Sequence, residues 1–329
     1  MPTAHASPRL DAFQRFTVVT LVATLALTAL GGAVRATDSG LACPDWPRCY
    51  GLWIPPADLN IWLEHSHRLL AGLVGLMIAG LLVWALLRHR RREVLGPVLA
   101  AAVLVNVQAA LGALVVLRLL QAGLVTAHLG MAMVIIACLI MVITGYRRPA
   151  LPRADRAPRD LAFARASALI AGLCLVQILV GGHVTGINAG LVYTDFPLMG
   201  GALFPEITDQ REAYHVAHRL LAYLLTGGIF YLAWQAVRLR AQRRVAGQWS
   251  DAQRWLVTLP LWAAALVVIQ IALGVANLWT QTSFVTVIPH LAVASWLWTV
   301  LVFLTFLAYR HAPVLGARSE PVDPEEVTA

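Results

Sequence analysis

The chain has 329 residues, of which 59% are hydrophobic and 13% are charged. This composition is too apolar for an ordinary soluble domain and is typical of an integral membrane protein. All 25 basic residues are arginine, and the formal net charge is +8. The sequence shows neither a soluble basic face nor basic residues interleaved with aromatic ones, so we do not expect nucleic-acid binding.

Several apolar stretches are long enough to cross a bilayer, which takes about 20 residues of helix. A stretch in lipid must satisfy its own backbone hydrogen bonds, so each is expected to be a helix. We therefore predict an all-α integral membrane protein with eight transmembrane helices. The stretches lie near 16–34, 66–87, 95–117, 122–144, 161–184, 214–237, 256–278 and 287–309. The first lacks a small-residue cleavage pattern and is expected to be retained.

Arginine-rich segments indicate the topology of the chain. They follow the second, fourth and sixth apolar stretches. Because cytoplasmic loops of membrane proteins carry an excess of basic residues, these segments are predicted to be cytoplasmic. Residues 1–15 and 310–329 then form cytoplasmic tails, and the second of these is expected to be disordered. The longest loops, 35–63 and 185–213, lie on the outer side.

The two halves of the chain repeat each other. Residues 31–34, Gly-Gly-Ala-Val, are matched by Gly-Gly-His-Val at 181–184, and Gln-Ala-Ala-Leu-Gly at 108–112 is matched by Gln-Ile-Ala-Leu-Gly at 270–274. Each unit holds an even number of helices, so both enter the membrane in the same direction and form a parallel repeat. We therefore predict two four-helix bundles, at 16–144 and 161–309.

Four histidines occupy matching positions in this repeat. They are His67 and His128 in the first half and His218 and His290 in the second. An ionisable residue within a membrane span is expected to be functional. Each lies within about two turns of the outer end of an even-numbered helix, so the two members of a pair share a similar depth.

Two imidazoles on facing helices of one bundle can supply both axial ligands of a haem iron. The duplicated pairs therefore predict two similar haem pockets. For any one of these histidines alone, a hydrogen bond across helices or a place at the wet interface is an open alternative. A zinc site is less expected, since the sequence has no HExxH motif and no cysteine beside either pair.

Three features together resemble the haem A synthase family. They are the stretch at 32–47, the string Glu64-x-x-His67-Arg68, and the second His-Arg pair at 218–219. The resemblance runs from the first apolar stretch to the eighth. It implies an enzyme that oxidises one ring methyl group of haem O to a formyl group by successive hydroxylations, which yields haem A for cytochrome oxidase.

The resemblance also implies ligands, partners and location. His67 and His128 would face haem O as the substrate, whereas His218 and His290 would ligate a permanent haem b. Haem O synthase and cytochrome oxidase assembly factors are candidate protein partners, and a bacterial inner membrane is the expected location. Homo-oligomerisation is open, because Gly72, Gly75 and Gly80 would let helices approach closely within a bundle or between protomers.

Glu64 distinguishes the first pocket from the second. It lies nearly one helical turn before His67, whereas the matching residue in the second half is His215. A carboxylate here could accept a proton or stabilise a developing positive charge, and members of the family use the matching residue in catalysis. The alternative is a simple ion pair with Arg68, worth about 0.2–0.5 kcal/mol.

Cys43 and Cys49 flank a short segment of the first outer loop, where the environment is oxidising and a disulfide can persist. A bridge between them would staple the loop over the pocket or, as in some similar proteins, take part in redox chemistry. The second outer loop has no cysteine, which departs from relatives with two such pairs. Cys138 and Cys174 lie inside apolar stretches and are expected to behave as small hydrophobic residues.

Arg35, Arg68 and Arg219 lie at outer helix ends. A planar guanidinium suits a haem propionate, although these side chains could equally anchor helices at the interface. Two other functions are compatible with the histidines. A di-haem b electron-transfer protein that oxidises quinol would need the histidines but has no evident use for Glu64. A transporter with parallel repeats would use them as proton relays.

Overall fold

The computed structural model describes residues 10–146, 161–243 and 251–311. Within these ranges the chain forms eight α-helices joined by loops. They are α1 (Ala12–Ala36), α2 (Leu59–Arg88), α3 (Arg92–Leu117), α4 (Ala122–Tyr146), α5 (Leu161–Gly186), α6 (Gln210–Arg243), α7 (Asp251–Trp279) and α8 (Phe284–His311). Each is long and apolar enough to cross a membrane. The predicted all-α, multi-pass membrane fold is therefore confirmed.

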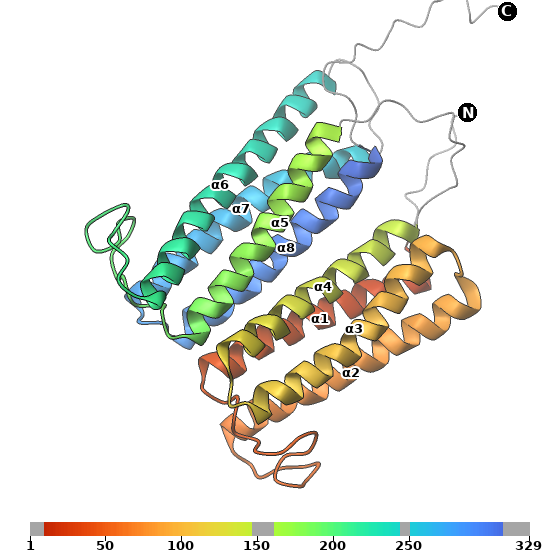
Figure 1. The fold of residues 1–329 in the computed structure, drawn as a ribbon. Coiled ribbons are helices and arrows are strands. Elements are labelled where there is room, and N and C mark those ends of the chain that lie inside the picture. Colours follow the sequence, from red (N-terminus) through yellow and green to blue (C-terminus); the bar gives the residue numbers. More distant parts are fainter. Residues whose placement is uncertain (1–9, 147–160, 244–250, 312–329) are drawn as a thin grey trace, which may run out of the picture.

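The helices form two groups that lie side by side, α1–α4 and α5–α8 (Figure 1). Within each group, helices that follow one another in sequence pack together, and the first helix also packs on the fourth. Diagonal helices are held apart, since no Cα atom of α2 lies within 8 Å of a Cα atom of α4, nor one of α6 near α8, in the described residues. This arrangement is compatible with the predicted pair of four-helix bundles.

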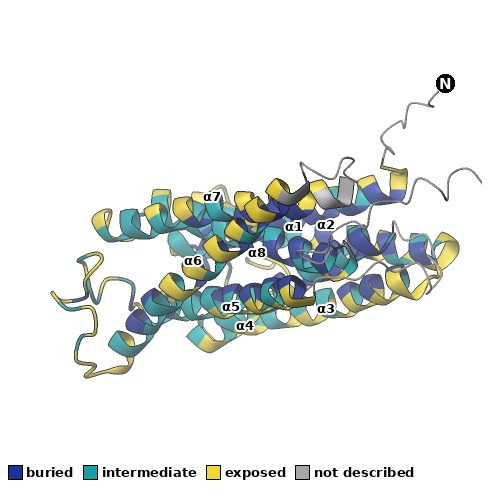
Figure 2. Ribbon diagram, turned by 90° about the horizontal axis from the view of Figure 1, so that it is seen from above, coloured by how far each residue is buried: buried dark blue, intermediate teal, exposed yellow. Residues whose placement is uncertain are grey.

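The groups meet through α1 and α4 on one side and α5 and α8 on the other. A buried hydrogen bond crosses this interface, because Nε1 of Trp298 on α8 donates to the carbonyl oxygen of Met133 on α4 over 2.9 Å. Nearer the helix ends, Arg310 donates to the carbonyl oxygen of Thr144. Buried residues lie mainly on the facing sides of the helices, and exposed ones on the outward sides (Figure 2). The two groups therefore share one core.

Polar residues cap the N-termini of α1 and α2, and buried threonines of α1 form hydrogen bonds within that helix. Asp11 caps α1 and accepts a 2.8 Å hydrogen bond from the backbone N–H of Gln14. Asp58 caps α2 in the same way. The buried face of α1 carries threonines, and Thr17 and Thr24 donate their hydroxyls to carbonyl oxygens four residues earlier. Such internal bonding lets hydroxyls be buried in an apolar setting.

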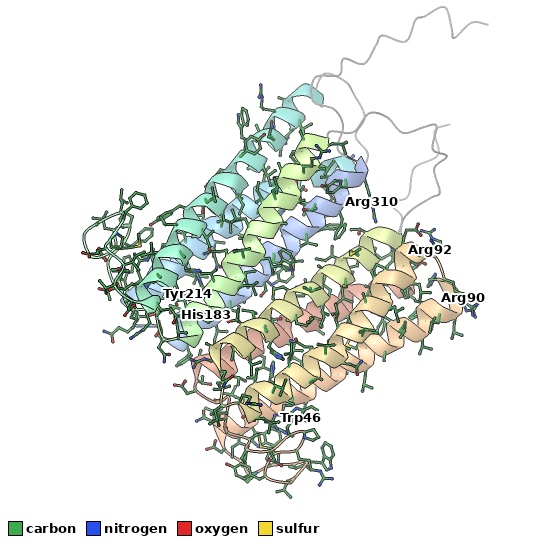
Figure 3. All side chains as sticks on the ribbon, viewed as in Figure 1. Trp46, Arg90, Arg92, His183, Tyr214 and Arg310 are labelled. Carbon is green, nitrogen blue, oxygen red and sulfur yellow. A yellow bond between two sulfur atoms is a disulfide. The ribbon has the colours of Figure 1, made fainter. Side chains whose placement is uncertain are left out.

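The two ends of the molecule differ in composition. Arg90, Arg92 and Arg310 lie at one end, whereas Trp46, His183 and Tyr214 lie at the other (Figure 3). The loops between α1 and α2 and between α5 and α6 both leave from the second end (Figure 1). This polarity agrees with the predicted separation of cytoplasmic arginines from outer loops. The assignment of each end to a side of the membrane stays a prediction, and most of both terminal tails lies outside the described residues.

Candidate functional site

The four predicted histidines lie on diagonal helices of the two groups. His67 is on α2 and His128 on α4, while His218 is on α6 and His290 on α8. All four side chains are half-buried. Among the described residues, Nδ1 of His67, His128 and His290 is buried and has no hydrogen-bond partner. Buried imidazole nitrogens without a protein partner, on helices that are held apart, are a donor set that suits axial ligation of a haem iron.

Each histidine ring packs against a glycine of the preceding helix. A methyl group added at Gly31 on α1 would lie 3.0 Å from Cε1 of His67, and one at Gly112 on α3 would lie 3.2 Å from Cε1 of His128. In the second group, a methyl group added at Gly181 would lie 2.7 Å from Cε1 of His218, and one added at Gly274 would lie 3.3 Å from Cε1 of His290. A larger residue at these positions would therefore push on the ring.

The sequence alone predicts no role for these four glycines. The repeat does mark these glycines, because they belong to the repeated segments at 31–34, 181–184, 108–112 and 270–274. A sequence does not show that a repeated glycine contacts a histidine on another helix, because that contact depends on how the helices pack.

Glutamine side chains contact the histidine rings of the second group. The side-chain amide nitrogen of Gln177 lies 3.1 Å from Nδ1 of His218, and that of Gln270 lies 3.2 Å from Nε2 of His290. The first group differs at both places. Gln108 donates to the backbone carbonyl oxygen of His128 instead of its ring, and the repeat places Leu27 where the second half has Gln177. The second pair of imidazoles thus has amide contacts that the first pair lacks.

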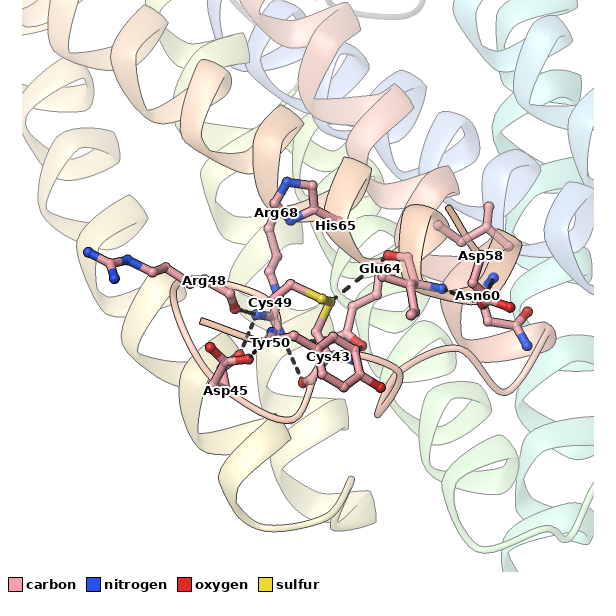
Figure 4. Close-up of a disulfide and its surroundings, with 12 residues drawn as sticks. Cys43, Asp45, Arg48, Cys49, Tyr50, Asp58, Asn60, Glu64, His65 and Arg68 are labelled. Atoms are coloured by element: carbon pink, nitrogen blue, oxygen red, sulfur yellow. Dashed lines mark hydrogen bonds and ion pairs between the residues drawn. A yellow bond between two sulfur atoms is a disulfide. The ribbon is translucent and has the colours of Figure 1, made fainter. Parts of the chain in front are cut away.

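The first outer loop is tied to Glu64 (Figure 4). Cys43 and Cys49 form the predicted disulfide. The backbone N–H of Cys43 donates to Oε2 of Glu64 over 2.8 Å, while Oε1 of Glu64 pairs with Arg68. Arg68 also donates to the carbonyl oxygens of Cys43 and Arg48. Glu64 is only 4% exposed, so its carboxylate is both buried and held between the loop and α2.

The second outer loop has a similar set of contacts without a disulfide. Arg219 donates to the carbonyl oxygens of Tyr193, Asp195 and Leu198 over 2.7–2.8 Å. Its Nε donates to Nε2 of His215, which leaves Nδ1 of that ring to donate to a backbone carbonyl of the loop. His215 therefore holds the second loop where Glu64 holds the first.

Two aspartates that the sequence analysis did not single out shape the loop tips. Asp45 accepts hydrogen bonds from the N–H groups of Tyr50 and Gly51, and Asp195 accepts them from Gly200 and Gly201. These backbone N–H groups, led by Gly51 and by Gly201, hold the pKa of each carboxyl below its usual range. The signal was the repeated Asp-x-Pro at 45–47 and 195–197.

The three arginines predicted to contact propionates are largely engaged with protein. Arg68 and Arg219 use nearly all of their N–H donors on the loops and on Glu64 or His215. Arg35 pairs with Asp38 at 3.2 Å and reaches a backbone carbonyl at the end of α5. Propionate contact stays a prediction, and the observed role of Arg68 and Arg219 is to hold the loops.

Reducing the disulfide is expected to loosen the first loop alone. A bridge that closes a loop of this size contributes about 2–3 kcal/mol by restricting the unfolded chain. Limited proteolysis of the purified protein, with and without a thiol reductant, measures the effect. We expect reductant, or the change Cys49→Ser, to speed cleavage within 37–58. The second loop is the internal control, and equal acceleration in both loops would contradict the prediction.

Comparison with known proteins identifies the family. The sequence model of the COX15-CtaA family, described as cytochrome oxidase assembly protein, matches residues 14–61 and 58–302. The chain is 30% identical to a Heme A synthase of Methylorubrum extorquens, over 84% of this chain and 82% of the relative. It is 29% identical to a Heme A synthase of Maricaulis maris, over 93% and 98% of the two chains. A Heme A synthase of Alkalihalophilus pseudofirmus is 28% identical, over 90% and 97%. The chain therefore belongs to the COX15-CtaA family of cytochrome oxidase assembly proteins, as the resemblance in its sequence implied.

Proposed function

We propose that this protein is a haem A synthase, a membrane oxidoreductase that converts haem O to haem A by oxidising one ring methyl group to a formyl group. The relatives that share this name cover most of the chain, which supports the activity. One structural observation carries the proposal furthest. Among the described residues, a buried carboxylate accompanies the first histidine pair and not the second, where His215 stands in place of Glu64.

The first group of helices, within 16–144, would hold the substrate, with His67 and His128 facing haem O. The second group, within 161–309, would hold a permanent haem b between His218 and His290. Side-chain amides contact the rings of the second pair and not those of the first, so the two pairs are not equivalent, which supports different roles for them. When bound, the haem iron supplies the redox chemistry, and the protein supplies position and electrostatics.

Glu64 is the proposed catalytic residue. It precedes His67 by nearly one turn of α2, so both residues lie on nearly the same face of that helix. A buried carboxylate can accept a proton or stabilise positive charge that develops on the substrate. The disulfide loop and Arg68 fix this carboxylate through the N–H of Cys43 and an ion pair. The proposed role of the disulfide is therefore to keep Glu64 in position.

The proposed location is the inner membrane of a bacterium, with both termini in the cytoplasm and both pockets near the outer side. The separation of arginine-rich ends from loop ends supports this orientation (Figure 3). Haem O synthase is a proposed partner because it would deliver the substrate, and assembly factors of cytochrome oxidase are proposed to receive the product.

Substituting Gly181 with alanine is expected to expel the permanent haem. The added methyl group would lie 2.7 Å from Cε1 of His218, a distance that forces the ring to move. Gly172 on the same helix is a matched control, because nothing lies within 4 Å of a methyl group added there. Haem content per chain, measured by absorbance after purification, should fall in Gly181→Ala and be unchanged in Gly172→Ala. Equal haem content in the two variants would contradict the contact.

The activity is tested in cells that make haem O but lack a haem A synthase of their own. Expression of this protein should produce haem A in the membranes, detected by chromatography of extracted pigments. Unchanged haem O in membranes that contain the folded protein would overturn the proposal. Haem b reduced by quinol in such membranes, with no haem A, would favour the electron-transfer alternative.

A further inference from the structure

Two leucines cross the interface between the helix groups and lie against glycines. Leu291 on α8 approaches Gly32 on α1, where an added methyl group would lie 2.8 Å from its Cδ2. Leu129 on α4 approaches Gly182 on α5, with a corresponding distance of 3.0 Å. Each leucine follows a histidine of its own group directly in sequence, since His290 precedes Leu291 and His128 precedes Leu129.

Beside each of these two glycines lies a second glycine that contacts a histidine of the other helix group from the leucine's. Gly32 follows Gly31, which packs on the ring of His67, and Gly182 follows Gly181, which packs on the ring of His218. One continuous path therefore runs from His290 through Leu291 and the glycine pair to His67. A second path runs from His128 through Leu129 to His218. Each path joins one histidine of each pocket.

These contacts are placed to transmit displacement. A peptide bond links each leucine to its histidine and each glycine to its neighbour, so neither link can lengthen. Each leucine lies between its histidine and the glycine pair of the opposite group in a closely packed interface, so the leucine and the glycine pair are the direct link between the two histidines. The buried hydrogen bond from Trp298 to Met133 ties α8 to α4 at the same interface and opposes a shift of one helix group relative to the other.

We infer that Leu129 and Leu291 are positioning residues that couple the two pockets, each setting the position of a histidine in the opposite pocket. The inference deepens the proposed function and rests on it, because it takes the two pockets to hold substrate and permanent haem. Occupancy of one pocket then changes the ligand geometry of the other. By linkage the effect is reciprocal, so the permanent haem also tunes the affinity for the substrate.

The test compares two glycine substitutions that create contacts of equal length. Gly182→Ala places a methyl group 3.0 Å from Leu129, and Gly228→Ala on α6 places one 3.0 Å from Ile170 on α5, within the second helix group and outside both paths. Electron paramagnetic resonance and the midpoint potential of the permanent haem are the readouts. We expect a displaced signal in Gly182→Ala, an unchanged one in Gly228→Ala, and a return toward the wild type in Gly182→Ala with Leu129→Ala.

Leu129→Ala alone keeps the inference testable if Gly182→Ala does not fold. In wild-type protein, added haem O should displace the signal of the permanent haem, and in Leu129→Ala this response should be reduced. Equal responses in the two proteins, or equal signals in Gly182→Ala and Gly228→Ala, would overturn the inference. Wild-type protein that purifies without haem b would instead show that the proposed function is wrong.

Discussion

Replacing His218 or His290 with alanine is expected to remove the permanent haem almost completely, whereas replacing His67 or His128 should abolish conversion and retain haem b. The two pairs lie on separate diagonal helices of separate groups, so the loss of one axial ligand affects its own pocket first. Haem type and content per chain, measured by pigment chromatography of each purified variant, distinguish these outcomes.

His183→Ala is the matched control for these substitutions. His183 is a histidine on α5 near the outer end, but its ring contacts the ring of Tyr214 in a tilted arrangement, with a centroid distance of 4.4 Å. Its loss should leave both haem content and conversion close to the wild-type values. The opposite pattern in the four ligand variants, with haem b lost from the His67 and His128 variants, would reverse the assignment of the two halves.

Glu64→Gln is expected to lower the rate of haem O oxidation by about 10²–10⁴, the usual contribution of a positioned acid or base. Glutamine keeps the size of the side chain and can still accept the hydrogen bond from Cys43, so the loop and the bound haem should be retained. The measurement is turnover by membranes that contain equal amounts of each protein, together with haem content.

His215→Gln is the matched control, because it puts the same residue at the corresponding position of the second half. It should weaken the second loop, which His215 holds through Arg219, with much less effect on turnover. If Glu64 served only as an ion pair with Arg68, Glu64→Gln would lower thermal stability and leave turnover unaltered. That result would contradict a catalytic role.

The helical fold follows from the sequence because lipid leaves few alternatives for an apolar stretch. Every predicted span corresponds to a helix of the structure, but the helices are longer than the spans. The second predicted span begins at 66, for example, whereas α2 begins at Leu59. Hydropathy identifies the part that crosses the membrane, and the remaining turns depend on caps such as Asp58. Glu64 is therefore helical although it precedes the apolar run.

The site was only partly predictable. Duplication singled out the histidines as candidate ligands, because pairs of imidazoles in matching positions are unusual in apolar spans. The glycines that support the rings, the amides of Gln177 and Gln270, and the N–H of Cys43 that holds Glu64 all act across different elements. Such contacts depend on the rotation and spacing of helices, which a single sequence does not specify. The repeat nevertheless marked most of these positions.

The different roles proposed for the two similar pockets are tested most directly by the pigments extracted from the purified wild-type protein. We expect haem b together with haem O, its hydroxylated product or haem A, because one pocket holds a permanent group and the other a substrate that is being converted. Haem b as the sole pigment, in both pockets, would contradict the account.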